Sequence, residues 1–175
     1  AGEAVGEELS ERGKKKVLCV IHEQGNVSLE ERCDGAEKTF DGELETLNVD
    51  GTNMPGFQSS VEARLQADED IDAVLTLGAP FAATSAKAKE RAGSEAEIDT
   101  FDLNAQVVKE MKAGRIGFAV DQQPFLQGYE AVDALWLHAY NANALGGGKP
   151  VLTGPEIVTR EDVPELEKYT GRGTR

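Results

Sequence analysis

The side chains best suited to chemistry in this sequence follow short apolar runs. Such runs lie at 17–21, 44–49, 71–77, 98–101 and 116–120. The polar side chains that follow them are His22, Glu23, Gln24, Asn26, Glu31 and Arg32 after the first run, Asp50, Thr52 and Asn53 after the second, Asp102 and Asn104 after the fourth, and Asp121, Gln122 and Gln123 after the fifth. Amides donate and accept hydrogen bonds, carboxylates accept from hydroxyls, and arginine supplies a fixed fork of donors. This set suits a neutral ligand rich in hydroxyl groups, and the plainer interpretation is that surface loops are polar anyway.

The sequence motifs of common enzyme classes are missing. The chain has no GxxxxGK[ST] phosphate loop, no GxGxxG, no HExxH and no GxSxG motif. His22 could act as a base or a ligand, but the other histidine, His138, lies far along the chain, so a structural role is the simpler interpretation. The glycines at 146–148 follow a predicted helix and are interpreted as a linker. The sequence therefore predicts no catalytic residue, no metal site and no cofactor.

Helix-length segments separate the apolar runs, at about 2–12, 28–40, 56–68, 80–92 and 104–113. Ser28 with Glu31 fits a capping box, and Gly93 and Gly114 stand where helices should stop. Short, unbroken apolar runs are typical of strands buried on both faces of a parallel sheet, and each strand–helix–strand unit needs a right-handed crossover. The alternation predicts an α/β fold, a three-layer α/β/α sandwich with a parallel sheet.

The alternation changes after Val120. A long helix is predicted from Pro124 to Asn141, because apolar residues recur there at helical spacing. These residues are Phe125, Val132, Leu135, Trp136, Ala139 and Tyr140. Beyond the turn at 146–150, β-like pairs are expected at 151–152 and 157–158, followed by a short helix that ends near Tyr169.

Composition excludes several classes of partner. The chain of 175 residues has 18 Lys+Arg against 32 Asp+Glu, a formal net charge of −14. This charge repels nucleic acids and anionic membranes, so neither is expected as a partner. The 39% of hydrophobic residues is ordinary for a globular protein, and the length is sufficient for one domain with its own core.

The two cysteines, Cys19 and Cys33, are too few for a disulfide scaffold and have no CxxC spacing. The first lies in a predicted strand and the second in the helix that follows, so they could pair if the chain matures outside the cytoplasm. The alternative is two buried thiols that behave as small apolar side chains.

Two motifs carry a family resemblance, Glu-Arg-Cys-Asp-Gly at 31–35 and Gln-Gln-Pro-Phe-Leu-Gln-Gly at 122–128. Together with the stretches at 17–21, 25–26, 71–74 and 150–155, they resemble type I periplasmic sugar-binding proteins. These are the ribose- and galactose-type receptors of ABC importers, and they are related to the effector domains of lac-repressor-type regulators. The resemblance implies a small carbohydrate ligand clamped between two lobes.

The resemblance also implies which residues contact the ligand. They are Arg32 on the helix that follows the first strand, Phe101 and Asp102 at the end of the fourth strand, Gln122 at the hinge and Asn53 in the loop after the second strand. Asp102 is the expected acceptor for sugar hydroxyls, and the ring of Phe101 would cover the apolar side of a sugar. Ribose-type receptors have Asn-Asp after the third strand where this chain has Gly78-Ala79, which argues against ribose itself.

In this family two α/β lobes are joined by a three-stranded hinge, and the chain resembles the second lobe. Residues 1–121 would form the C-terminal lobe, 122–149 the hinge and a helix that returns to the other lobe, and 150–175 the C-terminal crossing strand and tail. The implied location is extracytoplasmic, either periplasmic or lipid-anchored at the cell surface. The implied partners are the membrane permease subunits of an ABC importer.

Without a first lobe, the apolar side chains of the 124–141 helix lack their usual partner. We therefore expect this chain to form a homodimer through that helix. Two other functions stay open at this point. One is a flavodoxin-like cofactor-binding enzyme or electron carrier, and the other is the effector domain of a lac-repressor-type regulator.

Overall fold

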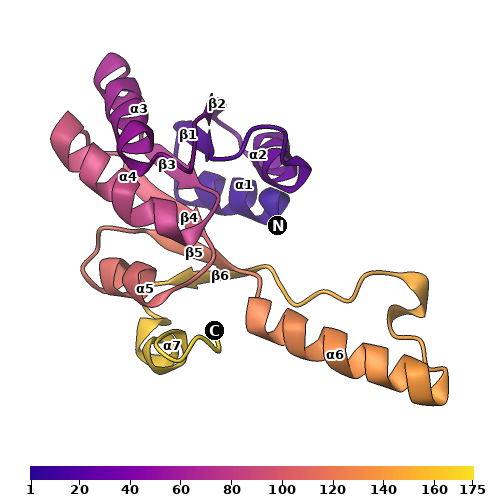
Figure 1. Ribbon diagram of the computed structural model, residues 1–175. Helices are drawn as coiled ribbons and strands as arrows, with labels where there is room; N and C mark the ends of the chain where they lie inside the picture. The colour runs from indigo at the N-terminus through magenta and orange to yellow at the C-terminus, as the bar shows by residue number, and fades with distance from the viewer.

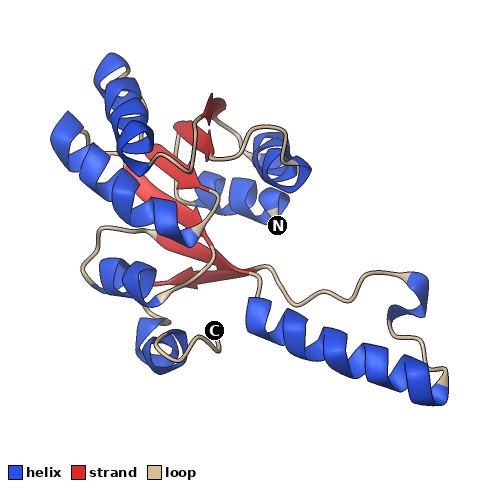
Figure 2. Ribbon diagram, in the orientation of Figure 1, coloured by secondary structure: helices blue, strands red, loops and turns tan.

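A six-stranded sheet in the order β2-β1-β3-β4-β5-β6 forms the centre of the computed structural model, which describes residues 1–175 (Figure 2). The strands are β1 (Lys16–Ile21), β2 (Glu43–Asn48), β3 (Ala73–Thr76), β4 (Glu97–Phe101), β5 (Phe118–Asp121) and β6 (Glu156–Thr159). All neighbours are parallel except β5 and β6, which are antiparallel. The predicted α/β fold with a parallel sheet is confirmed.

Helices cover both faces of this sheet. One face is packed by α1 (Gly2–Glu11) and α2 (Val27–Thr39), and the other by α3 (Met54–Ala67), α4 (Ala79–Ala92), α5 (Ala105–Lys112) and α7 (Val163–Thr170). Successive side chains of β1 alternate between the two cores. Val17, Cys19 and Ile21 join the α1–α2 core, and Leu18 and Val20 join the other. The inner strands β1, β3, β4 and β5 are therefore buried on both sides, which explains their unbroken apolar runs.

Three local predictions need correction. Strand β2 is not buried on both faces, because it lies at the edge of the sheet and pairs only with β1. Val151 and Leu152 form no strand and are exposed. Helix α2 begins at Val27, so its cap is Asn26, whose Oδ1 accepts from the Ser28 backbone N–H at 3.2 Å. Ser28 is already inside the helix and cannot serve as the cap.

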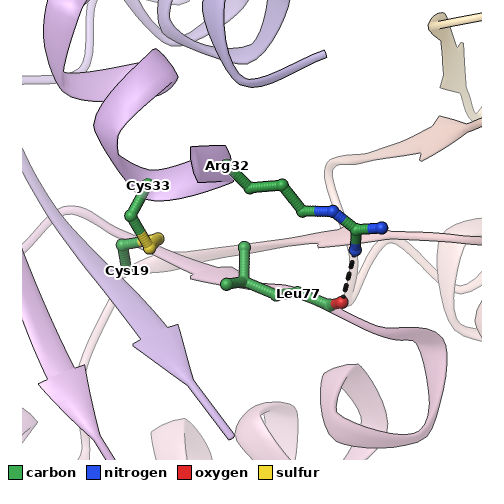
Figure 3. Close-up of a disulfide and its surroundings, with 4 residues drawn as sticks. All are labelled: Cys19, Arg32, Cys33 and Leu77. Atoms are coloured by element: carbon green, nitrogen blue, oxygen red, sulfur yellow. Dashed lines mark hydrogen bonds between the residues drawn. A yellow bond between two sulfur atoms is a disulfide. The ribbon is translucent and has the colours of Figure 1, made fainter. Parts of the chain in front are cut away.

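A disulfide joins the sheet to α2. Cys19 of β1 and Cys33 of α2 are bonded, with their Cα atoms 6.0 Å apart (Figure 3). Both residues are buried in the α1–α2 core. Of the two interpretations left open by the sequence, the structure has the disulfide.

Helix α6 (Pro124–Asn141) has the predicted limits but does not join either core. It extends away from the sheet and its covering helices, and the chain returns along it to β6 (Figure 1). No residue of α6 is buried, so the helix does not fold back on its own sheet. A short 3₁₀ turn at Gly146–Gly148 lies on the return path, as expected for a linker. No helix in the chain has the length and apolar character needed to cross a membrane.

Candidate functional site

Arg32 of α2 lies across the carboxyl ends of β3 and β4. Its Nη1 donates to the Leu77 carbonyl oxygen at 2.8 Å (Figure 3). Its Cζ lies 4.5 Å from the centroid of the Phe101 ring, within the range of a cation–π contact. Burial lowers the pKa of Arg32 from its ordinary value, and the nearby Asp102 carboxylate opposes that shift. The guanidinium is thus held in a fixed orientation with donors still free.

Asp102 and Gln122 meet at the same end of the sheet. Gln122 Nε2 donates to Asp102 Oδ1 at 3.1 Å, whereas Oδ2 accepts no hydrogen bond within the chain. Asp102 has φ 66°, in the left-handed region that residues other than glycine seldom adopt. Its backbone N–H donates to the Val120 carbonyl at 2.9 Å, which holds this conformation in place. Such strained positions are concentrated at functional sites.

Arg32 and Gln122 both line a hollow of about 390 Å³. The structure therefore brings Arg32, Asp102 and Gln122 together on one rim of the sheet. Parallel strands place their carboxyl ends at one edge, which is where open α/β sheets bind ligands. The cluster offers donors from Arg32 and Gln122 and an acceptor from Asp102, a combination that matches hydroxyl groups.

The expected role of Phe101 is corrected by its burial. The side chain is fully buried, so it has no face to offer a ligand. As the last residue of β4, Phe101 joins the α1–α2 core directly beneath Arg32. The aromatic ring supports the guanidinium and does not cover a sugar. Asp102, the next residue, is the first one to leave the sheet.

Asn53 stands apart from the other predicted site residues. It is exposed at the start of α3, where its Oδ1 accepts from the Gly56 backbone N–H at 3.0 Å and caps the helix. No contact joins it to Arg32, Asp102 or Gln122. The same loop instead lines a second hollow, of about 400 Å³, with Asp50 and Thr52.

His22 lines this second hollow, and the sequence interpretation had given it a structural role. Its ring stacks on Phe81 of α4, with centroids 4.0 Å apart and an interplanar angle of 26°. Burial lowers the pKa of His22 from its ordinary value. The ring lies near Arg32, because a Cβ at Gly78 would be 3.6 Å from His22 Cε1 and Arg32 donates to the carbonyl oxygen of the preceding residue, Leu77. The signal available in the sequence was its position as the first residue after β1.

The segment that contains α6 leaves the sheet after β5 and returns to it before β6, and both points lie beside the cluster of Arg32, Asp102 and Gln122. The Gln122 carbonyl accepts from Thr153 Oγ1 at 2.7 Å, and Gln123 Nε2 donates to the Thr153 carbonyl at 2.6 Å. Arg175 adds a third segment, because its Nε lies 2.6 Å from Oδ2 of the buried Asp121. Gln122 therefore belongs both to the rim cluster and to the base of the α6 excursion.

Residues 1–143 match the family described as periplasmic binding protein domain. The chain belongs to this family. Its members are extracytoplasmic, non-enzymatic solute-binding components of transporters, so membership replaces the flavodoxin-like alternative. A carbohydrate transporter from Acidothermus cellulolyticus, solved in complex with myo-inositol, is 45% identical with a TM-score of 0.96. The match covers 99% of this chain and 61% of that one.

Two more distant relatives also match this chain, the first by its structure and the second by its sequence. The Caulobacter myo-inositol binding protein, bound to myo-inositol, is 21% identical with a TM-score of 0.76, over 94% of this chain and 58% of that one. The xylose/arabinose-binding protein of Sulfolobus acidocaldarius is 23% identical over an alignment of 172 residues that covers 91% of this chain and 42% of that protein. The chain thus spans less than two thirds of the length of each of these relatives.

Proposed function

We propose that this chain is the C-terminal lobe of a two-lobed sugar-binding protein that serves an ABC importer. The observation that carries the proposal is the cluster of Arg32, Asp102 and Gln122 on one rim of the sheet, at the base of the α6 excursion. The 45% identity to a protein that holds myo-inositol supports a small polyhydroxylated ligand. The chain spans 61% of that protein, which leaves room for a second lobe.

In the proposed mechanism the ligand is bound between this rim and the other lobe. Asp102 accepts hydrogen bonds from sugar hydroxyls, Arg32 donates, and Gln122 does either. A ligand that contacts both lobes has higher affinity for the closed state and shifts the population toward it. Because Gln122 lies in the hinge, its bond to Asp102 links the ligand site to the segment that moves.

The proposed organisation has the C-terminal lobe at 1–121, the hinge and returning helix at 122–149, and the C-terminal crossing strand and tail at 150–175. The exposed apolar side of α6 would then pack against the other lobe of the complete protein. The working site is outside the cytoplasm, in the periplasm or on a lipid anchor at the cell surface. There the protein would deliver its sugar to the permease subunits.

Calorimetric titration of the complete protein with myo-inositol and D-allose tests the proposal. We expect saturable binding of at least one of them, and a loss of at least tenfold in affinity for Arg32→Met, because a buried ligand oxygen would lose a charged donor. Arg64→Met is the matched control, since Arg64 pairs with Glu45 and Asp68 away from the rim. Absence of binding to either sugar, or equal affinity of wild type and Arg32→Met, would contradict the proposal.

A further inference from the structure

The carboxyl end of β3 presents no side chain to the proposed ligand. Gly78 follows the strand in extended conformation, with φ −176°, so its backbone does not require glycine. A Cβ atom at position 78 would meet only Phe81 Cδ2 at 3.5 Å, His22 Cε1 at 3.6 Å and Phe81 Cε2 at 3.7 Å, which are ordinary van der Waals contacts. A side chain at position 78 would therefore lie directly beside the stacked rings of His22 and Phe81.

The His22–Phe81 pair is held firmly in that place. Phe81 packs on the buried Phe57 ring, with centroids 5.0 Å apart. On the other side, the Gly51 backbone N–H donates to the His22 carbonyl at 2.8 Å. A Cβ at position 51 would lie 2.7 Å from that carbonyl oxygen and 3.0 Å from His22 Cβ, so only glycine lets this loop approach. The imidazole is thus pre-oriented, which reduces the entropy lost on binding.

The two nitrogen atoms of the His22 ring form no hydrogen bond within the chain. Nδ1 is buried under protein atoms and has no hydrogen-bond partner, whereas Nε2 has no partner either but is not buried, so Nε2 is the nitrogen open to a ligand. A buried polar atom without a partner is costly, and such exceptions call for a specific explanation. Burial keeps the pKa of His22 below its ordinary value, so the ring is neutral at neutral pH. A neutral imidazole has one donor and one acceptor nitrogen, which matches a hydroxyl group.

We propose that His22 is a further ligand-contacting residue, and that its ring supplies from β1 the polar contact that Gly78 cannot supply from β3. This inference rests on the proposed function, because it assigns to His22 a hydroxyl of the same sugar that Arg32 and Asp102 bind. The stacked Phe81 ring sets the orientation of the imidazole and acts as a positioning residue. His22 thereby contributes to the choice among sugars that differ at one hydroxyl.

The test removes the two ring nitrogens of His22 and keeps the aromatic stacking on Phe81. In the complete protein, His22→Phe retains an aromatic ring on Phe81 and removes both nitrogens. We expect about a tenfold loss of affinity for myo-inositol by calorimetry, with an unchanged melting temperature. Adding Gly78→Asn to His22→Phe places an amide in the open space and should recover part of the loss. His22→Met, of similar volume, gives the same expectation if the phenylalanine variant does not fold.

The outcomes separate this inference from the proposed function. Wild-type affinity in His22→Phe, together with a loss in Arg32→Met, would overturn the role of His22 and leave the proposed function intact. Failure of the wild-type protein to bind either test sugar would overturn both. A loss in His22→Phe that the added Gly78→Asn substitution partly reverses would support the ligand contact, because a purely structural role for the imidazole would not be restored from a different strand.

Discussion

The side-chain amide of Gln122 donates to the carboxylate of Asp102 across 3.1 Å, and this bond joins the residue that follows β5 to the residue that follows β4. One carboxylate oxygen is engaged in this bond, so the other is left to accept from a ligand. The backbone of Asp102 has φ 66°, in the left-handed region. In the proposed function, the hinge and the ligand site therefore share this hydrogen-bonded pair.

Asp102→Ala should weaken sugar binding by about 1–3 kcal/mol, because ligand hydroxyls buried on binding would lose their acceptor. Calorimetry on the complete protein measures the change. Asp102→Asn is the control: it keeps a carbonyl acceptor and tolerates the left-handed backbone, so it should lose less affinity than the alanine variant. Equal affinity of Asp102→Ala and wild type would contradict the assignment.

The Cys19–Cys33 disulfide predicts a simple labelling result. Alkylation of the denatured chain without reductant should add no label, and alkylation after reduction should label both thiols by mass spectrometry. The closed loop spans a sequence separation of 14. Loop-closure entropy then predicts that replacing both cysteines by alanine lowers the free energy of unfolding by about 3 kcal/mol. Two labels without reductant would show that the bond is absent from the protein.

Asp99 of β4 predicts an unusual pH dependence. It is fully buried; its Oδ1 accepts from the Phe118 backbone N–H at 3.0 Å and its Oδ2 has no partner. Burial raises the pKa of Asp99 well above its ordinary value, and the charge of Glu97 adds to the rise. The folded state therefore holds this proton at pH values where the unfolded state has released it. Between the unfolded and folded pKa values, the contribution of Asp99 to stability falls as pH rises.

Asp99→Asn removes this ionisation and keeps an oxygen for the Phe118 N–H. We expect the variant to be more stable than wild type at pH 8. The difference in unfolding free energy should shrink as the pH falls and level off once Asp99 is protonated in both states. Urea denaturation between pH 4 and pH 8 measures it. A difference that is the same at every pH would show that Asp99 does not titrate in this way.

The apolar side of α6 predicts self-association of residues 1–175 produced alone. Trp136 and Tyr140 stack with ring centroids 5.2 Å apart, and Trp136 is 54% exposed. Burying one such side chain is worth roughly 1.5–3 kcal/mol, so several together favour a dimer. Sedimentation at micromolar concentration should show a dimer, and Trp136→Glu should return it to a monomer. Leu152→Glu, an exposed apolar residue outside α6, should leave the dimer unchanged. A monomeric wild-type chain would refute the prediction.

The sequence was sufficient to predict most of the helices and strands, and it supplied the candidate ligand contacts. Periodicity placed each predicted helix and nearly every strand within about two residues of its observed limits. That success has a physical reason, because β-type runs and helical spacing record burial on a local scale. Arg32, Asp102 and Gln122 could be proposed as ligand contacts because the resemblance to periplasmic sugar-binding proteins implies them, and parallel strands bring the residues that follow them to one edge.

Which of these side chains is left uncovered, and so available to a ligand, depends on the tertiary packing. Phe101 is covered by Arg32, and His22 stacks on Phe81 beside Gly78. These relationships join residues from different strands and helices, so no local pattern encodes them. The disulfide between Cys19 and Cys33 was likewise open until α2 was seen to pack over β1. Long-range packing determines such contacts, because it depends on the order of strands in the sheet and not on the spacing of residues along the chain.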